Sequence, residues 1–192
     1  MKIIDISQEL TSCAVYPGDP RPSLKRLKST SDGELYNLSA LEMCVHNGTH
    51  IDAPFHFLDG GYTVEGIPLE RCVGKCYVAR FDGALGKADA ESILKTADGA
   101  KRILIGGKVT VTASAARAFA DAEIMLIGNG GTSVGPEEEP MEVHKILLEK
   151  GIVLLEGIVL DDVKEGEYFL NAAPLNIKGS DGSPCRAYLI EF

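Results

Sequence analysis

The stretch HNGTHIDAPFH, residues 46–56, decides how the rest of this chain is interpreted. It contains three of the four histidines in a chain of 192 residues, together with one aspartate. In an extended segment side chains alternate between two faces, so His46, His50 and Asp52 should project to the same side. Neutral imidazoles and a carboxylate are ligands that zinc and similar divalent ions accept. The stretch therefore predicts a metal site on a β-segment, with Gly48 allowing the backbone to bend.

The clustering of the histidines favours a metal site over a purely structural role for each of them. A lone histidine is most often a partly buried residue with satisfied hydrogen bonds. Three histidines on one short segment would repel one another once protonated, unless a cation or an ordered hydrogen-bond network keeps them neutral. A metal is the simpler of these two explanations.

Two residues far along the chain are candidates to complete the site. His144 precedes Leu147 and Leu148 by three and four positions in a predicted helix, so it should face the apolar interior. Glu156 interrupts the apolar run of residues 152–160, where an isolated carboxylate is costly unless it is paired or bound to a metal. The alternative for Glu156 is an exposed edge of its strand.

The surrounding sequence indicates a mixed α and β architecture. Residues 113–122 are rich in alanine and predict a helix, and residues 141–150 predict another that stops at Gly151. The glycine-rich residues 128–136 predict a loop that lacks the spacing of a phosphate-binding motif. The strands expected from β-rich or apolar runs cover residues 3–6, 38–52, 75–81, 102–105, 123–127 and 152–160.

Bulk composition narrows the class of protein. With 45% hydrophobic and 24% charged residues, the chain resembles an ordinary globular domain, and we expect one domain over residues 1–192. A formal charge of −9 disfavours nucleic acid and anionic membranes as partners. We find no signal peptide or apolar span and expect a cytoplasmic protein. The five cysteines are scattered and odd in number, so free thiols are expected.

Several motifs together resemble the cyclase-like metal hydrolase family that includes bacterial kynurenine formamidase (arylformamidase). The resemblance covers nearly the whole chain. It implies a β-rich α/β domain of the swivelling β/β/α type, usually assembled as homodimers or higher homo-oligomers. The motifs are His46-x-Gly48-Thr49-His50-x-Asp52-x-Pro54-x-His56, Tyr16-Pro17-Gly18-Asp19, the spacing of His144 to Glu156, and Asp181-Gly182-Ser183-Pro184-x-Arg186.

The resemblance also implies the role of each site residue. His46, His50 and Asp52 would hold one divalent ion, and Asp52, His144 and Glu156 a second, with Glu156 also within reach of the first. Zinc is the first expectation for both ions and manganese the second. His56 would donate and accept protons.

The substrate that the resemblance implies is an aromatic amide. A metal-activated hydroxide would cleave N-formylkynurenine to kynurenine and formate, a step of tryptophan catabolism, and Tyr16 would stack on the aromatic ring. Formamidases often carry tryptophan where Tyr16 stands, and residues 131–135 replace their Thr-Pro-Ser-Val-Asp-like loop. The alternatives are hydrolysis of an isatin-like cyclic amide, an imide or a lactone, or a non-catalytic domain that binds a metal or small molecule.

Overall fold

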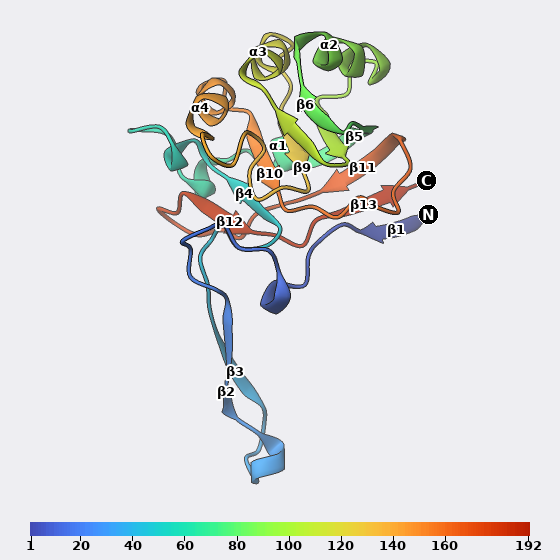
Figure 1. Cartoon of the computed structure of the whole chain (residues 1–192). Coiled ribbons are helices and arrows are strands. Elements are labelled where there is room, and N and C mark those ends of the chain that lie inside the picture. Colours follow the sequence, from blue (N-terminus) through green and yellow to red (C-terminus); the bar gives the residue numbers. More distant parts are fainter.

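One mixed sheet organises the molecule. The computed structural model describes residues 1–192 and is shown in Figure 1. In spatial order the strands are β1 (Lys2–Asp5), β13 (Tyr188–Glu191), β11 (Gly166–Asn171), β5 (Val73–Arg80), β7 (Arg102–Gly106), β9 (Leu126–Asn129), β10 (Val153–Glu156), β4 (His50–Asp52) and β12 (Gly182–Pro184). The central strands β5, β7, β9 and β10 run parallel, and the outer strands pair antiparallel.

Helices cover one face of this sheet (Figure 1). They are α2 (Lys87–Thr96), α3 (Ala113–Asp121) and α4 (Met141–Glu149), while the single turn α1 (Leu69–Cys72) leads into β5. The α3 helix begins where the Thr112 side chain accepts a hydrogen bond from the Ala115 amide. Its alanines let the helix pack closely, and its Phe119 is fully buried.

Two apolar cores lie on opposite faces of the sheet because side chains alternate along each strand. In β7, Ile103 and Ile105 pack with Phe119 beneath the helices, whereas Leu104 between them points to the other face. There it packs with residues from β4, β10 and β13, where the mixed sheet curls around them into a half-barrel. This arrangement confirms the predicted α/β fold class.

A hairpin extends away from this body (Figure 1). It consists of β2 (Ser23–Lys28) and β3 (Leu38–Glu42), paired antiparallel, and we call residues 21–42 the arm. A second small sheet joins β6 (Gly83–Leu85) to β8 (Val109–Val111). Short 3₁₀ turns occupy Leu10–Ser12, Thr30–Asp32, Pro54–His56 and Val64–Gly66.

Some predicted boundaries were wrong. The predicted strand at residues 38–52 is two strands, because Gly48 adopts a left-handed φ of +65° and the chain turns between them. The strand predicted at 123–127 begins only at Leu126, since Glu123 has a positive φ of +53° where the chain leaves α3. The helices predicted at 113–122 and 141–150 are confirmed within a residue. No helix is long and apolar enough to cross a membrane.

Candidate metal centre

Strands β4 and β10 bring the carboxylates of Asp52 and Glu156 together with the imidazole of His50. They pair antiparallel with Glu156 opposite His50 and Leu154 opposite Asp52. All three polar side chains are buried, with exposed fractions of 2% for His50, 0% for Asp52 and 3% for Glu156. The strand-edge alternative for Glu156 is therefore excluded. Buried carboxylates are costly unless a positive charge or hydrogen bonds compensate their negative charge.

His46 reaches the same place from a turn and not from a strand. The expectation of one extended segment was wrong between residues 46 and 49, yet His46 Nδ1 still lies 2.8 Å from Asp52 Oδ1. Gly182 on β12 makes room for this ring, because a Cβ there would lie 2.5 Å from His46 Cε1. The bend at Gly48 also lets its carbonyl accept a hydrogen bond from His50 Nδ1 at 2.9 Å.

Helix α4 supplies His144 from above the sheet. Its Nδ1 donates to the Pro140 carbonyl at 2.9 Å, so the lone pair of Nε2 is directed at the cluster. Nε2 lies 3.2 Å from Glu156 Oε1 and 3.5 Å from Asp52 Oδ2. The backbone amide of Val134, in the glycine-rich loop, donates to the same Glu156 oxygen at 2.8 Å.

The donor atoms fit a cation. His50 Nε2 and Asp52 Oδ2 are buried and make no hydrogen bond, although His50 Nε2 is 3.4 Å from both Asp52 Oδ1 and Glu156 Oε2. Unpaired buried polar atoms of this kind are rare in proteins, and a metal ion would satisfy both. Two groups have potential ligand atoms within 4.8 Å of one another: His50 with Asp52 and Glu156, and His46 with Asp52 and His56. Both groups share Asp52, as the two expected ligand sets do. His56 stands beside His46 where His50 was expected, and His50 stands beside Glu156 where His144 was expected.

The charges of the cluster depend strongly on one another. Burial lowers the pKa of His46 and of His144, but the neighbouring carboxylates outweigh it and raise these values to about 9 and about 10. Burial also raises the pKa of Asp52, yet the three facing imidazoles hold it well below its usual value. The cluster therefore stabilises positive charge at its centre, which a metal ion can supply in place of protons.

His56 differs from the other histidines. It ends the turn Pro54–His56, and burial lowers its pKa, so its ring is neutral near pH 7. The ring stacks on His46 with 4.0 Å between centroids, and its Nδ1 lies 3.3 Å from Asp181 Oδ2. A neutral imidazole beside the candidate metal ligands can take up or release a proton.

Asp181 links two of these rings, a role that was not predicted from the sequence. Its Oδ2 accepts a hydrogen bond from His46 Nε2 at 2.9 Å and also faces His56 Nδ1. The bond to His46 lowers the pKa of Asp181 to about 2, so it stays ionised. The sequence feature that could have revealed this role is the motif Asp181-Gly182-Ser183-Pro184. Asp181 is its first residue and directly precedes Gly182, the glycine that accommodates His46.

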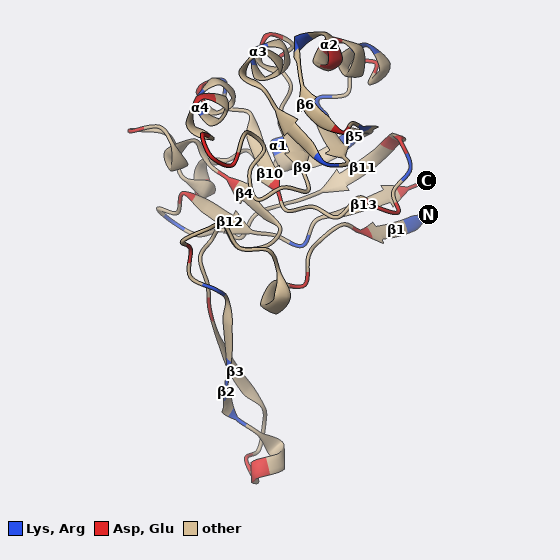
Figure 2. Cartoon of the chain, in the orientation of Figure 1, with Lys and Arg blue, Asp and Glu red and all other residues tan.

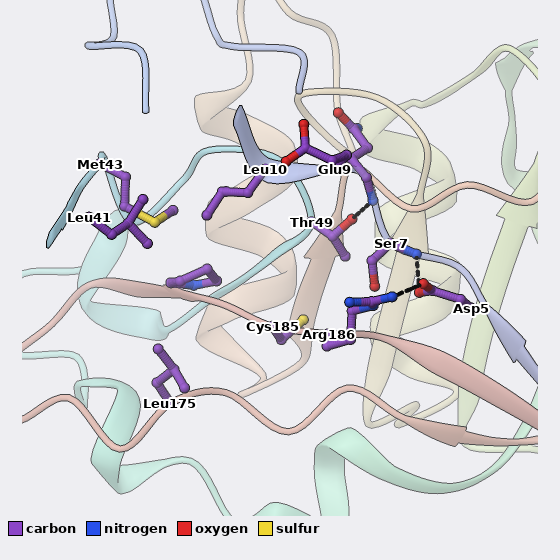
Figure 3. A pocket seen from close by; sticks show the side chains of 12 residues that line it. Asp5, Ser7, Glu9, Leu10, Leu41, Met43, Thr49, Leu175, Cys185 and Arg186 are labelled. Carbon is purple, nitrogen blue, oxygen red and sulfur yellow. Dashed lines mark hydrogen bonds and ion pairs between the residues drawn. The ribbon is translucent and has the colours of Figure 1, made fainter. Parts of the chain in front are cut away.

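A cavity of about 400 Å³ opens onto the cluster. Tyr16, half-buried, lies in its wall and donates a hydrogen bond from its hydroxyl to the Glu137 carbonyl at 2.6 Å. Phe57 also lines it, with its ring centroid 4.5 Å from that of His144. Larger cavities exist elsewhere, including one of about 510 Å³ beside the arm, but that one holds no histidine (Figure 3).

Comparisons with known proteins show to which family the chain belongs. Residues 4–162 match the family model described as a putative cyclase. A kynurenine formamidase of Erythrobacter litoralis is 33% identical over 205 aligned residues, covering 100% of this chain and 94% of that protein. The chain belongs to the cyclase family.

Solved structures extend the comparison to the fold. One described as a potential metal-dependent hydrolase with cyclase activity has a TM-score of 0.82 at 32% identity, covering 98% of this chain and 96% of the other. An isatin hydrolase bound to thioisatinate has a TM-score of 0.84 at 19% identity, covering 100% and 93% of the two chains. The isatin hydrolase therefore shares the fold of this chain.

Proposed function

We propose that this cyclase-family metal-dependent hydrolase is an arylformamidase that cleaves N-formylkynurenine to kynurenine and formate. The observation that carries the reaction type is a neutral, half-buried histidine, His56, beside buried ligand atoms that fit a cation. The substrate is proposed from the full-length relative named kynurenine formamidase. Physiologically, this reaction would serve tryptophan catabolism.

Two divalent ions per chain are part of the proposal, zinc first and manganese second. The residues that would hold them are His46, His50, Asp52, His144 and Glu156. Bound ions of this kind lower the pKa of water and polarise a carbonyl. Nδ1 of His50 and Nδ1 of His144 bond to the Gly48 and Pro140 carbonyls, so Nε2 of each ring is the nitrogen that would hold an ion.

His56 would carry the proton. Its Nδ1 faces Asp181, which leaves Nε2 to accept a proton from the attacking water and to deliver it to the departing aromatic nitrogen. Because the ring is neutral near pH 7, it is ready to act first as a base. Asp181 would stabilise the imidazolium that forms between these two steps.

The aromatic part of the substrate would lie between the cavity walls. Tyr16 is held in place by its bond to the Glu137 carbonyl and presents a ring for stacking. Phe57 adds a second aromatic surface beside His144. A half-buried proton carrier lining an open cavity argues against the non-catalytic alternative.

Three further expectations from the sequence remain proposals. We propose that residues 1–192 act as one domain, that the protein is cytoplasmic, and that it forms a homodimer or a higher homo-oligomer. The small-molecule substrate is its other proposed partner.

The test measures turnover in the wild type and in His56→Gln, with metal content determined on the same preparations. N-formylkynurenine is compared with isatin, an imide and a lactone. We expect formamide cleavage in the wild type and a loss of about 10²–10⁴-fold in kcat for His56→Gln with metal retained. Thr132→Val, in the same cavity wall, should retain turnover close to that of the wild type. Preference for isatin would overturn the proposal that N-formylkynurenine is the substrate. Full activity of His56→Gln would overturn the proposed role of His56 as the proton carrier.

A further inference from the structure

Four buried side-chain atoms of this chain have no hydrogen-bond partner. They are Asn47 Nδ2, His50 Nε2, Asp52 Oδ2 and Ser133 Oγ. Buried polar atoms without a partner are rare, and each needs an explanation. A cation accounts for His50 and Asp52, whereas the amide of Asn47 and the hydroxyl of Ser133 carry hydrogens to donate. Of these two donors, only Ser133 lines the cavity that opens onto the metal cluster, which we call the catalytic cavity.

Ser133 lies on a loop whose backbone is fixed on both sides of the residue. The Val134 amide donates to Glu156 Oε1 at 2.8 Å, and the Val134 carbonyl accepts from the Val111 amide at 3.0 Å. The Asn129 side chain donates to the Ser133 carbonyl at 3.4 Å. The Ser133 side chain therefore keeps only the rotation about its Cα–Cβ bond. A donor held in this way is pre-organised, because no backbone has to be ordered when it takes up a partner.

The neighbouring hydroxyl, that of Thr132, already has a partner. Its Oγ1 donates to Glu137 Oε1 at 2.7 Å. Glu137 begins the acidic run of residues 137–139 on the loop that leads into α4, which is red in Figure 2. Thr132 and Ser133 line the same cavity, so their hydroxyls differ mainly in whether a partner is present. Thr132 is therefore a matched control for Ser133.

We propose that Ser133 Oγ donates a hydrogen bond to the carbonyl oxygen of the amide that is cleaved. This inference rests on the proposed hydrolysis of an arylformamide. When water adds to the formyl carbon, the π electrons of the carbonyl move onto its oxygen. They return as the C–N bond breaks and the nitrogen takes the proton from His56. A donor at that oxygen binds more strongly as negative charge develops there, so it lowers the barrier.

The surroundings of Ser133 suit a donor and not a nucleophile. A nucleophilic serine needs a base that is hydrogen-bonded to its hydroxyl, and Ser133 Oγ has no such partner. Only 4% of Ser133 is exposed, so water competes weakly for the hydroxyl. An unpaired hydroxyl in these surroundings lowers the stability of the free protein and strengthens the bond that forms during the reaction.

Ser133→Ala separates this role from a structural one. We expect kcat to fall by roughly tenfold to a hundredfold with KM little changed, because the bond strengthens as the oxygen becomes charged. The melting temperature, measured before and after reconstitution with metal, should equal or exceed that of the wild type. The substitution removes an unpaired hydroxyl and breaks no hydrogen bond. Thr132→Val, whose hydroxyl is bound to Glu137, should keep kcat close to that of the wild type.

A thioformyl analogue of N-formylkynurenine identifies the atom that accepts the bond. Sulfur replaces the formyl oxygen in this analogue and accepts hydrogen bonds weakly. Ser133→Ala should therefore lose less than about threefold in kcat on the analogue, against the larger loss on the oxygen substrate. Any preference of the metal for sulfur is the same in both proteins and cancels in this comparison.

Failure of this inference is distinguishable from failure of the proposed function. A wild type that does not cleave the formamide would overturn both. A Ser133→Ala variant that cleaves it as fast as the wild type would overturn the inference alone. Equal losses on the oxygen and sulfur substrates would do the same. So would a Ser133→Ala variant with a lower melting temperature or less bound metal, because its hydroxyl would then be structural.

Discussion

At the scale of the residue, Asp52 is the centre of the site. It has no exposed surface, and its carboxylate lies 2.8 Å from His46, 3.4 Å from His50 and 3.5 Å from His144. A buried carboxylate persists as an anion only if positive charge surrounds it. Protons on these histidines and metal ions are alternative sources of that charge, so metal binding should displace protons.

Asp181 provides the first prediction at this scale. In Asp181→Asn we expect kcat to fall by about tenfold to a hundredfold. The neutral amide lacks the negative charge that orients the rings of His46 and His56. The negative charge of Asp181 acts to raise the pKa of His56. Its removal lowers that pKa further, so the acid limb of the pH profile of kcat should move to lower pH.

The control for this prediction is Asp19→Asn. Asp19 also lines the catalytic cavity, but its side chain accepts a hydrogen bond from Cys44 Sγ and not from a histidine. The Asp19→Asn variant should leave the acid limb of the pH profile of kcat in place. The Asp181→Glu variant, which keeps the negative charge, should recover part of the turnover that Asp181→Asn loses. An unshifted acid limb in Asp181→Asn would show that Asp181 does not act through His56.

At the scale of the element, the register of β4 between β10 and β12 builds the site. Ile51 pairs with Leu155, and both point into the apolar core on one face. His50 and Asp52 then face the opposite side with Glu156. A slip of one residue would bury the polar groups in the core and expose the apolar ones, so burial of Ile51 and Leu155 fixes the register.

The close approach of β12 to His46 gives the second prediction. Gly182→Ala places a Cβ 2.5 Å from His46 Cε1, closer than two such atoms can approach, so either the ring or the strand must shift. We expect a loss of about 1–3 kcal/mol in the free energy of unfolding, measured by chemical denaturation. Lys178→Ala, an exposed position on the preceding loop, should change it by less than about 0.5 kcal/mol. Equal stability of the two variants would contradict the packing described.

At the scale of the whole molecule, most of the correct predictions came from patterns within short stretches of the sequence. The density of histidines in residues 46–56 pointed to the cluster, and the alanine-rich run pointed to α3. Half of the arm was predicted, since β3 lies within the strand expected at residues 38–52. The strand β2 was missed because its sequence, SLKRLK, is mostly exposed and does not alternate between apolar and polar side chains. The role of Asp181 was missed because it lies 135 positions from His46 and meets it only through the sheet.

The most direct test of the central claim is metal content per chain, measured by mass spectrometry after reconstitution with zinc or manganese. We expect about two ions in the wild type. In Asp52→Asn both should be lost or greatly weakened, because Asp52 belongs to both groups of candidate ligands. A wild-type protein that binds no metal, or an Asp52→Asn variant that keeps two ions, would contradict the assignment of this cluster as a metal centre.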